Sequence, residues 1–272
     1  MIDIHNHIIP GVDDGSVSIE DSMEMVKQYI ASGYKGVICT SHHYPQKYDV
    51  TAEMIKDGIK LLNEECKKQG LVFSFYPGNE IYLDESTLTK LDKREISSLN
   101  GSRYVLIELP FLTKPHYARS LIYQLQLKGY IPILAHVERY KYVQDDLDWL
   151  LDFIKSGCLM QVNISSISRD KNSDEYKTIM TLLKRNMVHF IATDAHRSTW
   201  RTPEVSKELE MFRKVLGADE FQRVALVNPV KVISDEFISS AYEKIIFEEE
   251  KEKNKKPGVF ARIFKRLGWG EK

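Results

Sequence analysis

The chain has 272 residues, of which 43% are hydrophobic and 28% charged, and its net charge at pH 7 is −1. This composition is typical of a globular protein with a sizeable core, and the length allows one large barrel or two ordinary domains. Neither an apolar run of 18 residues nor a basic segment followed by an apolar core at the N-terminus occurs, so we expect no membrane span and no secretory signal.

Short apolar, β-rich runs alternate with helical stretches along the chain, which is the pattern of parallel βα units. Buried strands are predicted at Ile2–His5, Gly36–Thr40, Val72–Tyr76, Tyr104–Leu109, Ile131–Ala135, Leu159–Val162 and Val188–Ala192. Helices are predicted at Ile19–Ala31, with Ser18 as N-cap and Gly33 as stop, and at Met54–Lys68, Tyr117–Lys128 and Leu147–Lys155. Seven strands that alternate with helices favour a single α/β barrel, closed or nearly closed, over residues 1–247; an open doubly wound sheet is the alternative.

The C-terminal residues 248–272 differ from the rest of the chain. A charged linker, EEEKEKNKKPG, precedes a basic tail, and residues 251–272 carry eight Lys or Arg and two Glu. Apolar residues recur on one face of a helix in the tail, namely Val259, Phe260, Ile263, Phe264 and Leu267. Such a helix is expected to lie on an anionic membrane surface, with Trp269 at its end, or to pack on the barrel or a neighbouring subunit.

The preceding 250 residues carry 30 basic and 37 acidic side chains. An acidic body attracts nucleic acid poorly, so no nucleic-acid partner is expected. Cys39, Cys66 and Cys158 are well separated, which favours a reducing cytoplasm and argues against disulfides and thiolate zinc sites.

Metal-binding residue types follow the ends of the predicted strands. They are His5, His7, His42, Glu80, Glu108, His136, Asp194 and His196, with Asp14 in a loop that can reach the same face. In a parallel barrel the C-terminal strand ends open onto one face, where barrel enzymes carry their active sites. Buried carboxylates gathered there would repel one another without counter-ions, so the set predicts divalent metals such as Mn²⁺, Fe²⁺ or Zn²⁺.

Each of these residues also has a purely structural interpretation. A His-x-His pair can be satisfied in a core, Glu108 can pair with an arginine, and Asp194 can cap a helix. Only their joint occurrence favours metal binding. We expect His189, inside an apolar strand, to belong to the core, and His43 and His116 to lie near the mouth of the site.

Two arginines are candidates for binding a phosphate group. Arg139 follows His136 by three residues in AHVERY, and Arg201 follows the last ligand pair, with Arg197 as a competitor for its role. A planar guanidinium matches two phosphate oxygens, although both arginines could instead form surface salt bridges.

The chain lacks the sequence motifs of other enzymes that bind or hydrolyse phosphate esters. A thiolate phosphatase needs an arginine six residues after the nucleophilic cysteine, and those positions hold Pro45, Val72 and Ile164. The phosphate loop GxxxxGK[ST], the dinucleotide motif GxGxxG and the nucleophile elbow GxSxG are absent as well.

The segments DIHNHIIPGVDDG, TSHH, GNEIY, LIELP, AHVERY and ATDAH together resemble the polymerase-and-histidinol-phosphatase (PHP) superfamily. Within it, the chain is most similar to the bacterial manganese-dependent protein-tyrosine phosphatases that are found with capsule and exopolysaccharide genes. The resemblance covers about residues 1–238. It departs from the family pattern at His43, which follows His42, and in the basic tail.

The resemblance implies a distorted (β/α)7 TIM-like barrel that binds three metals. The first would be held by His5, His7, Glu80 and Asp194, the second by Glu80, Glu108 and His136, and the third by Asp14, His42 and His196. Arg139 and Arg201 match the substrate-phosphate arginines of the family.

The implied reaction is hydrolysis of phosphotyrosine on a bacterial tyrosine kinase, in the cytoplasm or at the inner face of the membrane. Because a phenolate, with a pKa of about 10, leaves more readily than an alkoxide, a strong general acid is less necessary for this substrate. The alternatives are a small-molecule phosphatase such as a histidinol-phosphate hydrolase, a nuclease of the same superfamily, and a non-catalytic metal-binding scaffold that docks a kinase.

Overall fold

The computed structural model describes residues 1–242 and 244–246. All seven predicted strands are confirmed, with ends that differ by at most two residues: β1 (Ile2–Asp3), β2 (Gly36–Cys39), β5 (Ser74–Pro77), β7 (Tyr104–Glu108), β8 (Ile131–Leu134), β9 (Leu159–Asn163) and β10 (Phe190–Ala192). Three short strands were not predicted: β3 (His42–Tyr44), β4 (Tyr48–Asp49) and β6 (Glu80–Tyr82). The linker and tail predicted at 248–272 lie outside the described residues.

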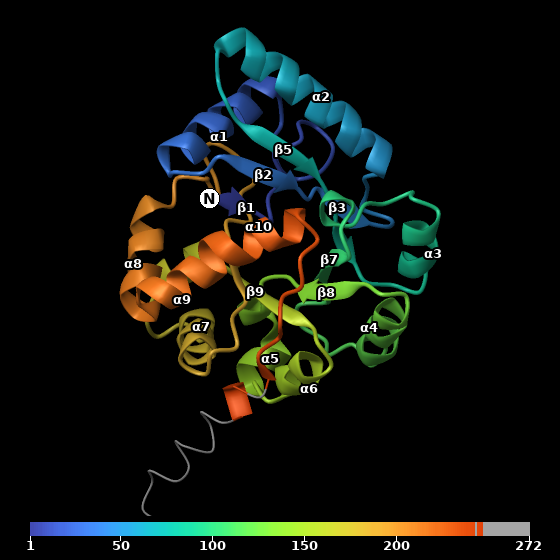
Figure 1. Ribbon diagram of the computed structural model, residues 1–272, viewed down its shortest axis with the longest axis vertical. Coiled ribbons are helices and arrows are strands. Elements are labelled where there is room, and N and C mark those ends of the chain that lie inside the picture. Colours follow the sequence, from blue (N-terminus) through green and yellow to red (C-terminus); the bar gives the residue numbers. More distant parts are fainter. Residues whose placement is uncertain (243, 247–272) are drawn as a thin grey trace, which may run out of the picture.

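The strands form two sheets, with the orders β1-β2-β5 and β10-β9-β8-β7-β6-β3-β4. Every pairing is parallel except that of β3 with β4. Backbone hydrogen bonds join the sheets: Asp194 N–H donates to the His5 carbonyl at 2.8 Å, and Glu80 N–H to the Thr40 carbonyl at 3.0 Å. The strands therefore follow one strongly curled surface (Figure 1).

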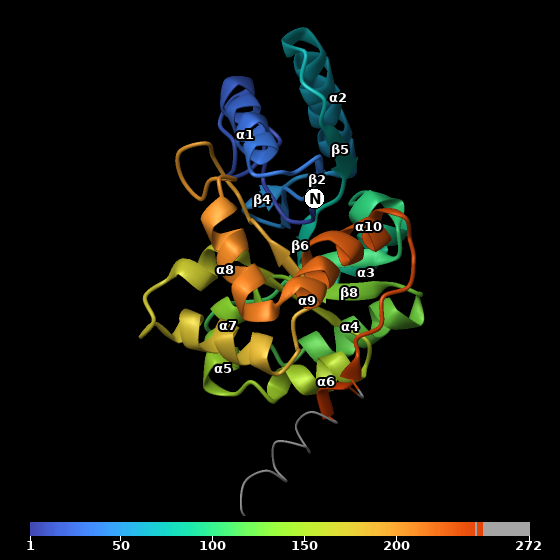
Figure 2. The same ribbon diagram turned by 60° about the vertical axis from the view of Figure 1, so that its left-hand side comes forward.

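Most helices cover the outer side of this curled sheet, whereas the helical segment 218–233 lies across one end of the strands, as Figures 1 and 2 show. The α-helices are α1 (Ile19–Ala31), α2 (Ala52–Gln69), α3 (Thr87–Asp92), α4 (Ala118–Leu127), α5 (Lys141–Asp145), α6 (Trp149–Lys155), α7 (Asp174–Lys184), α8 (Ser206–Leu216), α9 (Ala218–Gln222) and α10 (Asn228–Ile233). Short 3-10 turns occur at Leu99–Gly101 (η1), Val137–Arg139 (η2) and Ile164–Ser168 (η3), and a π-turn at Arg223–Val227 (η4). No described helix is long and apolar enough to cross a membrane.

The first helix shows why the helix predictions held. Ser18 is extended and its side chain accepts a hydrogen bond from the Asp21 amide, as an N-cap does. The helix ends at Ala31, and Gly33 follows with φ +84°, a left-handed conformation that glycine adopts without a steric penalty.

The core is divided by the sheet because strand side chains alternate between its two faces. Val105 and Ile107 of β7 belong to the larger hydrophobic cluster, which lies between the sheet and the helices. Leu106 belongs to a smaller inner cluster, together with Ile38 and Phe190. The inner cluster fills the concave side of the sheet. It ends where the strands end, and that is the level at which the predicted metal ligands begin.

Candidate metal centre

Because side chains alternate between the two faces of a strand, several predicted ligands point to the inner side of the sheet. Glu108 lies two residues beyond Leu106 of the inner cluster, and Asp194 lies two residues beyond Ala192. Each strand thus contributes apolar side chains to the inner core and then, at its C-terminal end, a polar side chain above it.

The structure brings all nine predicted ligands together. They fall into four overlapping groups whose ligand atoms lie within 4.8 Å of one another: His7, Asp14, His42 and His196; His5, His7 and Glu80; His5, His136 and Asp194; and His42, Glu80 and Glu108. These residues come from segments as distant as positions 5 and 196, so only the fold can gather them.

Glu80 lies at the centre of the cluster. Its Oε2 is 3.2 Å from His5 Nε2 and 3.0 Å from His42 Nδ1, and its Oε1 is 2.9 Å from His136 Nε2. His7 Nε2 is 3.4 Å from the same Oε2. A carboxylate with two oxygens facing different imidazoles can bridge two cations.

The histidines present lone pairs to the cluster because their other ring nitrogens are engaged. His5 Nδ1 lies 3.0 Å from Gln161 Oε1, His7 Nδ1 lies 2.8 Å from Asp13 Oδ2, and His196 Nδ1 lies 2.9 Å from the Asp194 carbonyl. In each case the hydrogen-bonded Nδ1 carries the proton and the lone pair is on Nε2, which faces the cluster in His5 and His7 and faces Arg201 Nη1 in His196.

Buried atoms without hydrogen-bond partners mark where cations fit. They include His5 Nε2, His7 Nε2, Asp14 Oδ1, His42 Nδ1 and Glu80 Oε2. Buried polar atoms are almost always paired in proteins, so five atoms that face one another without forming hydrogen bonds mark a place where cations can bind. Imidazole and carboxylate donors without thiolate suit Mn²⁺, Fe²⁺ or Zn²⁺, and the residues present therefore fit a divalent metal cluster.

The electrostatics of the metal-free protein support the same conclusion. Burial raises the pKa of Glu108 to about 8, and repulsion from Glu80 adds to this rise. Burial would also raise the pKa of Glu80, but His5 and His42 hold it well below its usual range. Burial lowers the pKa of His136 to about 4, so this imidazole is neutral at pH 7 and can bind a metal.

Both predicted arginines reach the cluster. Arg139 Nη1 lies 3.4 Å from Asp194 Oδ2, and its guanidinium lies 4.6 Å from the centre of the Phe111 ring. Arg201 contacts the same carboxylate, and its Nη1 is 3.1 Å from His196 Nε2. Both side chains are partly exposed, so they border the site and still reach solvent.

The backbone is strained where it carries three of these residues. His136, Asp194 and Arg201 have φ values of +32°, +51° and +50°, in the left-handed region that side chains other than glycine disfavour. Such conformations cost on the order of 1–3 kcal/mol each and persist where the surrounding structure enforces them, typically at functional sites.

An open cavity of about 120 Å³ lies over the cluster. Its lining residues are Asp14, His42, Tyr44, Lys47, Glu80, Glu108, Phe111, His136, Arg139, Asp194, His196 and Arg201. The cavity therefore joins predicted ligands, both arginines and aromatic side chains in one space.

The remaining histidines and Arg197 are placed elsewhere. His189 is buried between the Met160 amide and the Ser240 carbonyl, so its predicted core position is confirmed. His43 points to the opposite side of β3 from His42, and its Nε2 lies 2.8 Å from Lys90 Nζ. Arg197 donates to the Gly15 carbonyl at 3.2 Å and does not line the cavity over the cluster.

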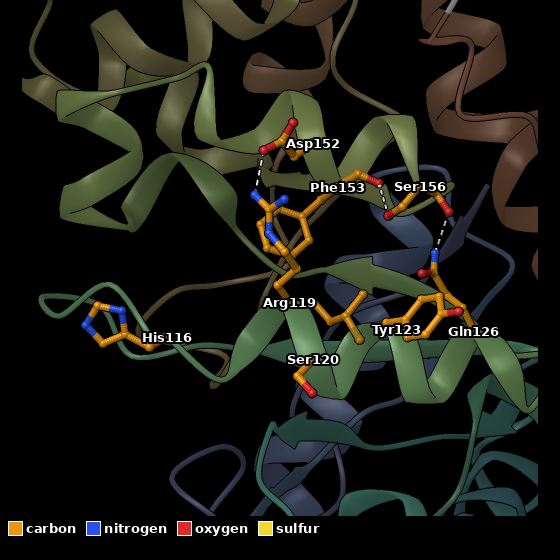
Figure 3. Close-up of a pocket in the computed structure, with 9 residues that line it drawn as sticks. His116, Arg119, Ser120, Tyr123, Gln126, Asp152, Phe153 and Ser156 are labelled. Atoms are coloured by element: carbon orange, nitrogen blue, oxygen red, sulfur yellow. Dashed lines mark hydrogen bonds and ion pairs between the residues drawn. The ribbon is translucent and has the colours of Figure 1, made fainter.

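The expectation that His116 lies near the mouth is wrong. His116 is exposed and lines a separate cavity of about 550 Å³ between α4 and α6, which Figure 3 shows. Its neighbours there include Arg119 and Asp152, which form an ion pair with each other. The loop after β7 is long enough to carry His116 away from the strand ends, although Phe111 at its start remains at the site.

Sequence reasoning missed the residues that orient the ligands. The Asp13 carboxylate is surrounded by hydrogen-bond donors. Its Oδ2 accepts a hydrogen bond from the His42 amide at 2.9 Å and faces His7 Nδ1. Its Oδ1 accepts a hydrogen bond from the Gly15 amide at 3.0 Å. A Cβ on Gly15 would lie 2.1 Å from the His7 carbonyl oxygen, so only glycine allows this loop to approach the strand. The sequence signal that could have identified Asp13 is the pair of adjacent aspartates, Asp13 and Asp14, before Gly15.

Gln161 and Asn163 of β9 form a second orienting group. Gln161 Oε1 faces His5 Nδ1 and accepts from the His136 amide at 2.9 Å, while its Nε2 donates to Asn163 Oδ1 at 3.0 Å. Asn163 in turn donates to Asp194 Oδ2 at 2.7 Å. One chain of side-chain amides therefore fixes three of the predicted ligands.

We expect Asp13→Asn to lower the affinity for metal about 10- to 100-fold, which is the usual effect of losing an outer partner of a ligating histidine. The amide has a single acceptor oxygen, so it cannot serve His7, His42 and Gly15 together. Metal content after dialysis against graded free Mn²⁺ measures the change, with Asp170→Asn on an exposed loop as the control. An unchanged affinity would show that Asp13 only shapes the loop.

Comparison with known proteins places the chain in a family. The family model described as "Capsular polysaccharide synthesis, CpsB/CapC" matches residues 1–234. The chain belongs to the CpsB/CapC family. CapC of Staphylococcus aureus is 38% identical over 241 residues, which cover 88% of this chain and 93% of CapC.

Other CpsB/CapC relatives are tyrosine-protein phosphatases by name. YwqE of Bacillus subtilis is 33% identical over 219 residues, which cover 80% of this chain and 86% of YwqE. CpsB of Streptococcus pneumoniae is 31% identical over 245 residues, which cover 88% of this chain and 100% of CpsB.

Solved structures agree with this assignment. A chain from the crystal structures of YwqE of Bacillus subtilis and CpsB of Streptococcus pneumoniae, described as unique metal-dependent tyrosine phosphatases, superposes with a TM-score of 0.83 at 32% identity. The match covers 88% of this chain and 96% of that chain. A dihydroorotase-like domain of Chaetomium thermophilum, with a TM-score of 0.54, is only 14% identical and covers 87% of this chain and 79% of its own. It shares the fold alone, and these neighbours are of the TIM-barrel type.

Proposed function

We infer that this CpsB/CapC chain is a metal-dependent protein-tyrosine phosphatase. The observation that carries this inference is the cluster of nine imidazole and carboxylate side chains under a cavity bordered by two arginines, in a chain whose relatives are tyrosine-protein phosphatases. By its family it acts in capsular polysaccharide synthesis.

We propose that the curled sheet forms one distorted (β/α)7 barrel over residues 1–247 and that its open end holds three Mn²⁺ ions. His5, His7, Glu80 and Asp194 would hold the first, Glu80, Glu108 and His136 the second, and Asp14, His42 and His196 the third. Bound divalent ions lower the pKa of water towards neutrality and offset charge on phosphoryl oxygens. The bridging position of Glu80 and the unpaired ligand atoms support this assignment.

The arginines bind and orient the phosphate group. Arg139 is held between the Phe111 ring and Asp194, so its guanidinium is already oriented when substrate arrives. Arg201 lines the same cavity from the loop after β10 and contacts the same carboxylate. Positioned guanidinium groups stabilise the charge that develops on the equatorial oxygens during phosphoryl transfer, at no cost of reorganisation.

The substrate we propose is a phosphotyrosine-bearing protein, specifically a bacterial tyrosine kinase. We expect the purified protein to contain more than one transition metal ion, to hydrolyse a phosphotyrosine peptide, and to lose this activity on chelation. Histidinol phosphate and a single-stranded oligonucleotide, assayed in parallel, test the two rival enzyme functions. Metal binding without hydrolysis of any substrate would instead indicate a kinase-docking scaffold.

We also propose that the protein is cytoplasmic and that residues 251–272 hold it at an anionic membrane surface, close to a membrane-attached kinase. Eight basic residues near such a surface contribute about 1 kcal/mol each. The intact chain should then sediment with liposomes that contain anionic lipid, whereas a chain that ends at Glu250 should not. Equal sedimentation of both chains would disprove this localisation. Activity on a soluble phosphopeptide should be nearly the same for both.

A further inference from the structure

The cavity over the metal cluster has two levels. The residues at its floor, such as Glu80, His136 and Asp194, are buried and ionisable. The more exposed residues that line it include Tyr44 and Phe111, which are aromatic, and Lys47. A group bound at the floor therefore extends outwards past a partly aromatic rim.

Strand register explains why Tyr44 stands directly above the cluster. β3 pairs in parallel with β6, and this pairing sets His42 opposite Glu80. Tyr44 and Tyr82 lie two residues further along their strands, so they occupy the same side of the sheet as His42 and Glu80, one step nearer to solvent. The two predicted ligands thus form one cross-strand pair, and the two tyrosines form the next pair on the same face of the sheet, nearer to solvent.

The orientation of Tyr44 is fixed before any substrate binds. Its ring stacks on Tyr82 with 4.1 Å between centroids and 1° between ring planes. The Lys47 ammonium, in the turn between β3 and β4, lies 5.9 Å from the Tyr44 ring centre and 4.9 Å from that of Tyr48. Tyr44 is consequently part of a rigid aromatic surface, formed by Tyr44 and Tyr82, at the edge of the cavity.

Phe111 has a different role at the same level. Its ring lies 5.3 Å from that of His136 at an interplanar angle of 29°, and the Arg139 guanidinium lies over it. A change at Phe111 would disturb a metal ligand and a phosphate-binding arginine together. Tyr44 contacts neither arginine, so its contribution can be measured separately.

We propose that the Tyr44–Tyr82 pair selects aryl phosphates. With the phosphate at the floor, between the arginines, the ring of phosphotyrosine lies at the level of Tyr44 and packs against it, whereas the short chain of an alkyl phosphate makes no such contact. Aromatic pairs attract beyond the area they bury, so the preference arises from the ring itself. This inference rests on the proposed phosphatase function and adds to it the residue that sets substrate class.

The test compares the binding of two ligands to the metal-loaded protein by titration calorimetry. Phenylphosphonate carries the ring, and inorganic phosphate lacks it. Tyr44→Ala should weaken phenylphosphonate binding about three- to tenfold and leave phosphate binding unchanged. Tyr44→Phe, which keeps the ring, should behave as wild type. Tyr123→Ala is the matched control because Tyr123 is 59% exposed and lines the separate cavity near His116.

Two results would overturn the proposal: an equal loss of affinity for both ligands, or no loss for either. If Tyr44→Ala fails to fold or loses metal, the affinities for phenylphosphonate and phosphate are compared in Tyr44→Leu instead, which keeps most of the side-chain volume. Turnover of a phosphotyrosine peptide is measured separately on the wild-type protein. Its absence would contradict the phosphatase function, whereas the calorimetric comparison would still decide whether Tyr44 recognises an aromatic ring.

Discussion

A Glu80→Ala variant is expected to lose bound metal and to hydrolyse a phosphotyrosine peptide more than about 10³-fold more slowly than wild type. Removing a single donor that stabilises a transition state already costs about 10²–10³ in rate. Glu80 faces His5, His7, His42 and His136, so its loss affects more than one of the proposed metals at once. Metal analysis and peptide turnover on the same preparation measure both effects.

Stability separates loss of a ligand from loss of the fold. In the metal-free protein His5 and His42 stabilise the ionised Glu80 carboxylate, so the metal-free variant should unfold at a lower temperature than metal-free wild type but still in one cooperative transition. Glu24→Ala, which removes an exposed carboxylate paired with Lys27, is the control and should leave metal and activity intact. Full metal content with activity within tenfold of wild type in Glu80→Ala would refute the bridging role.

Replacing Arg139 by alanine should lower kcat/KM about 10²–10³-fold, or about 2.7–4 kcal/mol, while metal content stays at the wild-type level. The guanidinium lies over Phe111 and beside Asp194, so it is positioned for the phosphate without being a ligand. Arg139→Lys should recover little of the activity, because a lysine ammonium cannot bind two phosphate oxygens in the planar, bidentate manner of a guanidinium.

The control for Arg139 is Arg119→Ala, since Arg119 is exposed and pairs with Asp152 away from the cluster. Its kcat/KM should equal that of wild type. An Arg139→Ala activity within twofold of wild type would mean that Arg139 is only a surface charge. The same substitution at Arg201 would reveal whether the two arginines share the phosphate.

The seven main strands were predictable because each is a buried apolar run between turn signals. The short strands β3 and β6 were not. They read His42-His43-Tyr44 and Glu80-Ile81-Tyr82, too short and too polar to show a strand pattern. They form because the chains of β2 and β5 resume pairing after a bend. The helix α7 was not predicted, although Ser173 caps it and Tyr176, Ile179, Met180 and Leu183 follow the spacing of an amphipathic helix.

The ligand types at the strand ends were also predictable, because parallel strands bring their C-terminal ends to one face. Their orienting partners were not. Gln161 lies 156 residues from His5, and nothing near either residue indicates their contact. The position of His116 was mispredicted for a related reason: a residue in a long loop is placed by the path of the loop, and local sequence does not determine that path.

The three cysteines lie in the hydrophobic core and not at the metal cluster. Cys39, Cys66 and Cys158 are all buried, and burial raises the pKa of the Cys39 and Cys158 thiols, that of Cys158 to about 12. Peroxide and alkylating reagents attack exposed thiolates, and the folded protein offers none. Oxidative signals that switch off thiolate phosphatases would therefore leave these cysteines untouched, and any sensitivity of the activity to oxidants would have to arise at the metal cluster.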